Sequence, residues 1–198
     1  MILFWSAMGA KLQILSIFIF VIFNVVAGQV LKWGRCPNIP VQPNFDVNSY
    51  MGEWYEYQRF FAIFELGVKC AKADYSIIDE STVRVVNTGF NKWTGKTSIA
   101  NGTATISDPA VPAKLKVKFS RFQPAGNYWV LDTDYNTYSL VYSCQDLYIA
   151  HSEITWILTR DRAGISDDTT NRLYSRLQEY GINPENFRPT DQTGCPQA

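Results

Sequence analysis

Few residues of this chain have the types and spacing that covalent chemistry requires. His151 is the one histidine in the sequence, and no cysteine or serine stands at a recognisable nucleophile motif. We interpret His151 as a polar surface residue at the end of a strand. The acidic residues are scattered over turns, with no pair that their spacing would force together, so acid–base hydrolysis has no support. We therefore predict that the protein is not an enzyme.

The four cysteines are Cys36, Cys70, Cys144 and Cys195. They contain no Cys-x-x-Cys pair, and with a single histidine they fit a zinc site poorly, so we expect neither a metal nor a cofactor. An even number of cysteines in a secreted chain indicates two disulfides and no free thiol. Three pairings are possible, and the sequence does not separate them.

The N-terminal segment has the features of a secretory signal. Residues 12–27 form a nearly unbroken apolar run behind a lysine, and the small residues Ala27 and Gly28 suit signal peptidase. We interpret residues 1–28 as a signal peptide and residues 29–198 as one domain of a secreted, extracellular protein. The alternative is a transmembrane anchor, but that needs about 20 apolar residues and a basic flank on the far side.

Charge and composition limit the classes of binding partner that the sequence favours. The chain has 18 Lys and Arg and 18 Asp and Glu, so no basic excess favours nucleic acid or an anionic membrane surface. Aromatic residues make up 15% of the sequence. This abundance suits a protein that encloses something apolar.

Alternating segments predict an all-β fold. In Lys114–Phe119 every even position is lysine and every odd position is apolar, so one face of this strand is expected to be exposed to solvent and the other buried. Eight antiparallel strands without crossover helices predict a closed up-and-down β-barrel, of a size that holds one small ligand. An open sandwich would need Greek-key connections that nothing in the sequence requires. The predicted strands are Trp54–Phe60, Lys69–Asp79, Thr82–Phe90, Lys96–Ile106, Ala113–Phe122, Asn127–Asp132, Thr137–Asp146 and Ser152–Arg160.

One C-terminal α-helix is expected after the strands. Ser166 and the two aspartates after it supply a cap and acidic charge at its start. Leu173, Leu177 and Tyr180 then recur at helical spacing, and Gly181 ends the helix. Because only one stripe is apolar, we expect the helix to pack outside the barrel, without a role in ligand binding.

Three motifs in fixed order, behind a secretion signal, resemble the lipocalin family. They are Gly52-Glu53-Trp54-Tyr55, Thr133-Asp134-Tyr135 and Trp156-Ile157-Leu158-Thr159-Arg160, and the resemblance covers the chain from about Gly34 to its C-terminus. It implies that Trp54 plugs the closed end of the barrel while Arg160 lies across its indole in a cation–π contact. It also implies a structural role for Gly52 and for the turn at Thr133, Asp134 and Tyr135.

The same resemblance implies the disulfide pairing. Cys36 would join Cys144, and Cys70 would join Cys195, which ties the N-terminal arm and the C-terminal tail to the barrel wall.

Asn101-Gly102-Thr103 is the one glycosylation sequon after residue 28, so we predict a glycan on Asn101.

The apolar alternation also predicts which side chains face the interior. Tyr128 is chosen over Trp129 by the resemblance, because both faces of that strand are apolar. Tyr75, Asn87 and Tyr128 are polar groups that can orient a carbonyl or carboxylate, and Phe119 and Trp156 supply flat area for stacking. The alternative is that these side chains only fill the core of a barrel. The predicted ligand-binding residues are Tyr75, Val85, Asn87, Leu115, Val117, Phe119, Tyr128, Val141, Ile154 and Trp156; Ala73, Ile77, Val83, Val130 and Leu158 are expected to face inward beside them.

Two functions follow. The first is secreted binding and transport of a small hydrophobic ligand, of the fatty acid, steroid, retinoid or bilin class, with protection of oxidisable lipids as a distant variant. The second is an interaction protein whose open-end loops contact a receptor, a membrane or a lipid particle. Residues 59–67 form an unusually apolar loop, and Phe60, Phe61 and Phe64 in it are a lid over the ligand or an exposed contact patch. We favour the lid.

Overall fold

The computed structural model describes residues 30–62 and 65–196 of the chain. The predicted signal peptide and Phe64 lie outside the described residues. The strands are β1 (Val30–Trp33), β2 (Gly52–Phe60), β3 (Val68–Asp79), β4 (Thr82–Asn91), β5 (Lys96–Ile106), β6 (Lys114–Lys118), β7 (Gly126–Thr133), β8 (Tyr138–Leu147), β9 (Ala150–Thr159) and β10 (Phe187–Pro189). The helices are α2 (Val47–Tyr50), α3 (Asp167–Glu179) and the 3-10 helix η2 (Pro184–Asn186).

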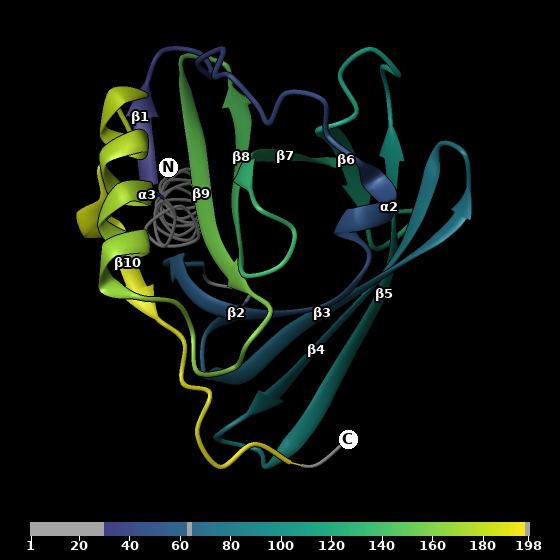
Figure 1. Ribbon diagram of the computed structural model, residues 1–198, viewed down its shortest axis with the longest axis vertical. Helices are drawn as coiled ribbons and strands as arrows, with labels where there is room; N and C mark the ends of the chain where they lie inside the picture. Colours follow the sequence, from purple (N-terminus) through teal and green to yellow (C-terminus); the bar gives the residue numbers. More distant parts are fainter. Residues whose placement is uncertain (1–29, 63–64, 197–198) are drawn as a thin grey trace, which may run out of the picture.

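Strands β2 to β9 form a closed antiparallel barrel (Figure 1). Each of these strands pairs with the next along the chain, and β9 pairs back with β2 through Tyr55–Thr159 and Arg59–Trp156. The predicted eight-stranded up-and-down barrel is confirmed. Strand β6 is shorter than predicted and ends at Lys118, before Phe119.

Two short strands that the sequence did not predict extend the sheet. β1 pairs with β9 over Val30–Glu153 to Trp33–Ala150, and β10 pairs with β2 over Phe187–Phe60 to Pro189–Gln58. Both are too short to show a clear alternation. They form because β9 and β2 leave edges that need partners for their backbone groups.

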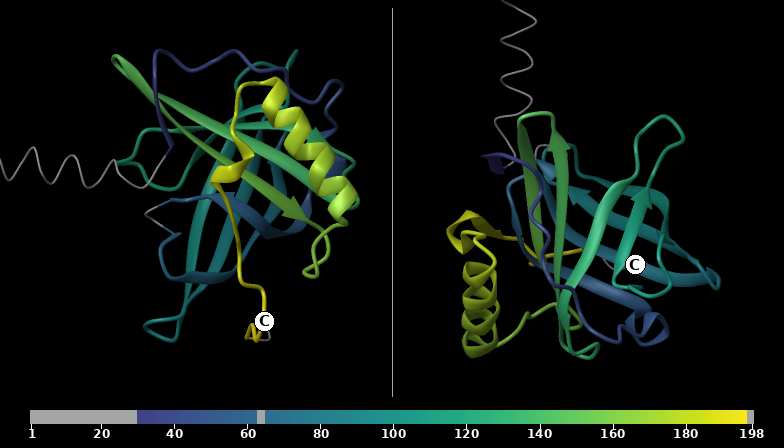
Figure 2. Two further views of the ribbon diagram at one scale, coloured as in Figure 1. Left: turned by 90° about the vertical axis from the view of Figure 1, so that its left-hand side faces the viewer. Right: turned by 90° about the horizontal axis from the view of Figure 1, so that it is seen from above.

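Helix α3 lies along the outside of the barrel (Figure 2). Its cap is Ser166, whose hydroxyl accepts a hydrogen bond from the backbone N–H of Thr169. Leu173 and Leu177 are fully buried in a cluster that includes Ile157 of β9. The predicted external helix is confirmed, and it ends before Gly181, which has a φ of +73°.

The N-terminal arm covers polar groups on the outer face of the barrel. His151 is buried, contrary to its interpretation as a surface residue, because β1 lies over it and Nδ1 is 2.9 Å from the carbonyl oxygen of Gly34. Next to it, Lys32 Nζ contacts the buried carboxylate of Glu153 at 2.8 Å. A strand of only 4 residues supplies this cover, so the pattern around His151 alone does not reveal it.

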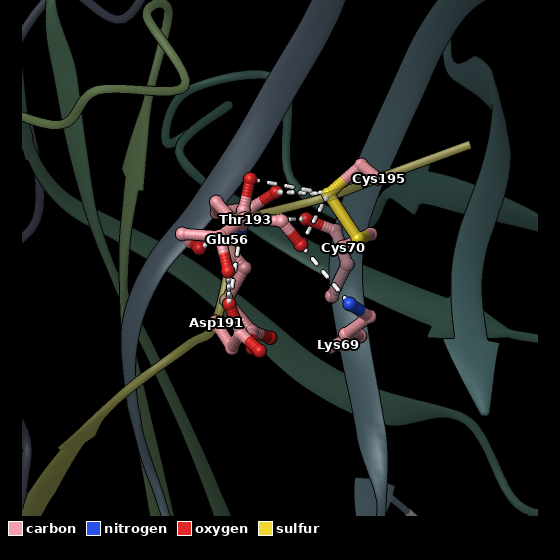
Figure 3. Close-up of a disulfide and its surroundings, with 8 residues drawn as sticks. Glu56, Lys69, Cys70, Asp191, Thr193 and Cys195 are labelled. Atoms are coloured by element: carbon pink, nitrogen blue, oxygen red, sulfur yellow. Dashed lines mark hydrogen bonds between the residues drawn. A yellow bond between two sulfur atoms is a disulfide. The ribbon is translucent and has the colours of Figure 1, made fainter. Parts of the chain in front are cut away.

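Two disulfides fasten the ends of the chain. Cys36 is bonded to Cys144, and Cys70 to Cys195. Figure 3 shows the second bridge where the tail crosses between the barrel strands. There the side-chain amide of Gln192 donates to the carbonyl oxygens of Glu56 in β2 (2.9 Å) and Ala71 in β3 (2.8 Å). The tail thus joins β2 and β3 beyond the point where they pair directly.

Among residues 30–62 and 65–196, no helix has both the length and the apolar character that crossing a membrane requires.

Candidate functional site: the barrel interior

The interior is sealed at the end where β2 begins. Trp54 is fully buried, and its indole N–H donates to the carbonyl oxygen of Tyr50 at 2.9 Å. The guanidinium carbon of Arg160 lies 3.8 Å from the centre of the Trp54 ring. Arg160 also donates to the carbonyl oxygens of Glu53 (2.8 Å), Met51 (2.8 Å) and Tyr135 (2.9 Å). One side chain therefore joins three chain segments at this end.

Gly52 permits this arrangement. Its φ of +91° is one that side chains disfavour, and a Cβ there would lie 3.4 Å from Nη1 of Arg160. A side chain at this position would strain the backbone, although its Cβ would only reach van der Waals contact with the guanidinium.

The β7–β8 turn supports the same end. Asp134 Oδ1 accepts hydrogen bonds from the backbone N–H groups of Thr137 (2.8 Å) and Tyr138 (3.0 Å). Partial burial alone would raise the pKa of Asp134, but these bonds and the Thr137 hydroxyl outweigh it and lower that pKa. Thr133 Oγ1 accepts from the backbone N–H of Tyr135, at 3.0 Å. The turn is held by its own side chains.

Strand register identifies the inward face. Residues directly opposed in antiparallel strands share a face of the sheet. Trp54 opposes Ala73, which opposes Asn87, and Asn87 opposes Ala100, so one row runs across four strands. Further rows join most of the other predicted positions around the barrel: Tyr75, Val85 and Gly102; Ile77, Val83, Ala104 and Val117; Leu115 and Tyr128; Val130, Val141 and Trp156.

The inward positions differ in how far their side chains are exposed to solvent. Val85, Leu115 and Val141 are buried in the cluster that surrounds Trp54. Ile77, expected to face the interior, is 45% exposed because it lies at the end of β3, where the pairing with β4 becomes irregular. Ile77 therefore shares the inward row of Val83, as expected, but the barrel does not enclose it.

Near the open end the inward side chains are less enclosed. Phe119 follows β6 and is 40% exposed, and its ring lies against the backbone of Gly102. Trp156 is half-buried and packs against both buried clusters of the protein, while Ile154 belongs to the cluster that contains Phe60. Asn87 Oδ1 is buried without a hydrogen-bond partner among the described residues.

Three tyrosines form a floor across the barrel. The Tyr128 hydroxyl lies 2.9 Å from that of Tyr75 and 2.9 Å from that of Tyr50, which is 2.8 Å from Ser139 Oγ. A cavity of about 10 Å³ adjoins them, which is room for about one water molecule. Tyr50 and Ser139 were not predicted as site residues: Tyr50 precedes the first predicted strand, and one serine in an apolar strand gives no distinct pattern.

A charged cluster between β2, the following loop and the tail also escaped prediction. Arg59 Nη1 contacts Glu56 Oε1 at 2.7 Å and donates to Thr190 Oγ1 at 3.1 Å. Its Nε faces the carboxylate of Glu65, in the loop. Burial, with the nearby charge of Glu56, raises the pKa of Glu65 to about 8. The sequence conceals this cluster because a bulge between Glu56 and Gln58 changes the alternation of β2.

Aromatic residues of the apolar loop differ in position. Phe60 is fully buried and lies 4.8 Å, centre to centre, from the ring of Phe187 in β10. It is therefore unavailable to a partner, and its assignment to a contact patch is wrong. Phe61 is exposed.

Asn101, the predicted glycosylation site, is exposed on β5.

Comparisons with known proteins match this geometry. A family model described as a lipocalin-like domain matches residues 45–192. Apolipoprotein D of Cavia porcellus is 40% identical over 190 residues, which covers 96% of this chain and 98% of that protein. The Lazarillo protein of Schistocerca americana is 34% identical over 154 residues, covering 76% of this chain and 71% of that protein. The solved structure of insecticyanin from Manduca sexta has a TM-score of 0.71 at 24% identity, covering 84% of this chain and 91% of that one.

Proposed function

The chain belongs to the lipocalin family, and we propose that it is a secreted protein that binds and carries one small hydrophobic molecule inside its barrel. The candidate ligands are fatty acids, steroids, retinoids and bilins. The observation that supports this most is the inward face itself: a closed apolar wall, sealed at one end by Trp54 and Arg160.

The proposed ligand position lies between the tyrosine floor and the open end. The wall that β5 contributes is built from small residues, Ala100, Gly102 and Ala104, which leaves more room than large side chains would. Val85 and Val117 are their aliphatic neighbours across the strands. Removing about 300 Å² of apolar ligand surface from water gives roughly 7–8 kcal/mol before ordering costs, consistent with micromolar affinity.

Trp156 provides the test. It faces the interior opposite Val141 and is half-buried, so a ligand above the floor should change its fluorescence. We expect delipidated protein to show saturable quenching with at least one ligand from the four classes. Trp156→Phe should remove most of that change, whereas Trp93→Phe should not, because Trp93 is 64% exposed on the β4–β5 turn. Saturable quenching that persists in Trp156→Phe and disappears in Trp93→Phe would contradict the proposed position.

A second candidate function rests on the mouth patch, which we define as Phe61, Leu66, Trp93, Phe122, Tyr148 and Ile149. Because neighbouring strands are antiparallel, the four loops that hold these residues all emerge at the end opposite Trp54. All six side chains are exposed. An apolar rim of this kind suits contact with a lipid surface, through which the ligand would enter or leave.

Vesicle flotation separates this candidate from simple carriage in solution. We expect the protein to float with neutral phosphatidylcholine vesicles, and a Phe122→Ser/Tyr148→Ser/Ile149→Ser variant to remain in the soluble fraction. Ile78→Ser is the matched control, because Ile78 is an exposed apolar residue near the closed end. Equal flotation of the triple variant and the parent would refute a role for the mouth patch.

A further inference from the structure

The floor of the barrel is a chain of four hydroxyl groups from four different elements. Tyr75 of β3, Tyr128 of β7, Tyr50 of α2 and Ser139 of β8 follow one another at 2.9, 2.9 and 2.8 Å. Nothing in the local sequence places these groups together. The closed fold does so, because inward positions of distant strands meet across its interior.

The row of four hydroxyl groups has one more donor hydrogen than it has hydrogen bonds. Each hydroxyl supplies one hydrogen, and three hydrogen bonds use three of the four hydrogens. Ser139 is fully buried and contacts no second acceptor among the described residues, so an unused hydrogen there would be costly. The favourable arrangement therefore has Ser139 donating to Tyr50, which leaves the unused hydrogen on a tyrosine.

Tyr75 is the best position for that hydrogen. The hydroxyls of Tyr50 and Tyr128 each have two partners in the chain, whereas that of Tyr75 has one. Donation then runs in one direction, from Ser139 through Tyr50 and Tyr128 to Tyr75. Bonds aligned in this way polarise one another, so the terminal hydroxyl becomes a stronger donor.

The space beside this donor is small and uncharged. The cavity of about 10 Å³ is lined by Tyr50, Tyr75 and Tyr128, with apolar side chains such as Val83 and Leu115 completing the wall. It can take one oxygen-sized group. Among the described residues that line it, none is cationic, so a carboxylate would lose its hydration without gaining an opposite charge.

The hydroxyls also remain neutral. Burial raises the pKa of Tyr50 to about 12 and raises the pKa values of Tyr75 and Tyr128 as well. The tyrosine hydroxyls therefore stay protonated at any physiological pH, and they act as hydrogen-bond donors rather than as ionised groups.

We propose that this binding site prefers neutral hydrophobic molecules with a terminal hydrogen-bond-accepting oxygen, as in a ketone, aldehyde or ester, and that Tyr75 donates to that oxygen. The inference rests on the proposed function and narrows its ligand class. The hydrocarbon part of such a ligand would extend toward the mouth past Val85 and Gly102, which share the Tyr75 row of the inward face.

Three compounds with one skeleton test the proposal: a ketosteroid, the same steroid without the ketone oxygen, and the matching steroid carboxylate. Tryptophan quenching in delipidated protein gives the affinity of each. We expect the ketosteroid to bind about tenfold more tightly than the deoxygenated steroid, the value of one good hydrogen bond. We expect the carboxylate to bind no better than the deoxygenated steroid.

Two variants locate the donor. Tyr75→Phe should reduce the preference for the ketone to about twofold or less, because it removes the terminal hydroxyl and keeps the ring. Ser139→Ala tests the direction of donation: three hydroxyls and two bonds still leave one free hydrogen, but without Ser139 it can lie on Tyr50 as well as on Tyr75, so the preference should fall below that of the parent and stay above that of Tyr75→Phe. If Tyr75→Phe fails to fold, the parent protein's ranking of the three compounds decides.

Equal affinity of the parent for the ketone and the deoxygenated steroid would overturn the inference while leaving the proposed function intact. Preference for the carboxylate, or a preference that survives in Tyr75→Phe, would also overturn it. If none of the three binds and no fatty acid, retinoid or bilin binds either, the proposed function fails, and the inference fails with it.

Discussion

Replacing Arg160 by alanine should destabilise the protein without selectively removing its capacity for ligand. The guanidinium carbon lies 3.8 Å from the Trp54 ring centre, a contact worth about 1 kcal/mol in a partly buried setting. Three hydrogen bonds of 2.8–2.9 Å to the carbonyl oxygens of Glu53, Met51 and Tyr135 would also be lost. At about 0.5–1 kcal/mol each, since water can reach part of this end, they bring the expected loss to about 2.5–4 kcal/mol.

Urea denaturation measures this loss directly, and thermal melting should show a decrease of about 10 °C for a domain of this size. Arg162→Ala is the matched control. Arg162 is an exposed arginine near the same end, 4.7 Å from the ring centre of Tyr55, so its loss should change stability little. The affinity of the folded Arg160→Ala protein for ligand should stay within about twofold of the parent, because Arg160 lies behind Trp54 rather than in the interior.

The opposite result would refute the structural assignment of Arg160. If the variant unfolds at the same urea concentration as the parent and yet no longer binds ligand, the guanidinium acts on the ligand and not on the closed end. Equal destabilisation by Arg162→Ala would show that charge at this end matters, rather than the specific contacts of Arg160.

Three further outcomes are expected. Replacing Cys70 and Cys195 together by serine should cost about 2–5 kcal/mol in urea denaturation and expose the tail to chymotrypsin at Phe187; a tail that stays resistant would show that Gln192 suffices to hold it. The pKa of Glu65 is raised to about 8 in the folded state. The stability that protonated Glu65 gives the folded protein is therefore fully present below the pKa that Glu65 has in the unfolded state, and it is lost as the pH rises through about 8. Glu65→Gln should therefore gain stability relative to the parent between pH 5 and pH 9, and a constant difference would contradict the assignment. Asn101→Gln should lower the mass of protein secreted by eukaryotic cells by one glycan, and an unchanged mass beyond the substitution itself would exclude glycosylation there.

The barrel and its inward face follow from short-range patterns. The alternation in Lys114–Phe119 and the helical spacing of Leu173 and Leu177 arise within single elements, so the sequence displays them directly. The same holds for the turn at Asp134, whose carboxylate bonds residues within four positions of it.

Other features depend on contacts between distant segments. β1 and β10 exist because β9 and β2 offer free edges, and His151 is buried because β1 covers it. Strict alternation would place Glu56 and Arg59 on opposite faces of the strand, and they come together only through the bulge in β2 and the tail that packs there. A strand pattern reports which face of a strand is apolar, but it does not report what another segment places against that face.

Binding of a small hydrophobic molecule inside the barrel can be measured by native mass spectrometry of the delipidated protein, loaded in turn with a fatty acid, a steroid, a retinoid and a bilin. We expect a complex of one ligand per chain with at least one class, and loss of that complex when the protein is unfolded. Folded protein that retains no compound from any of the four classes would contradict the claim that the barrel interior is a binding site.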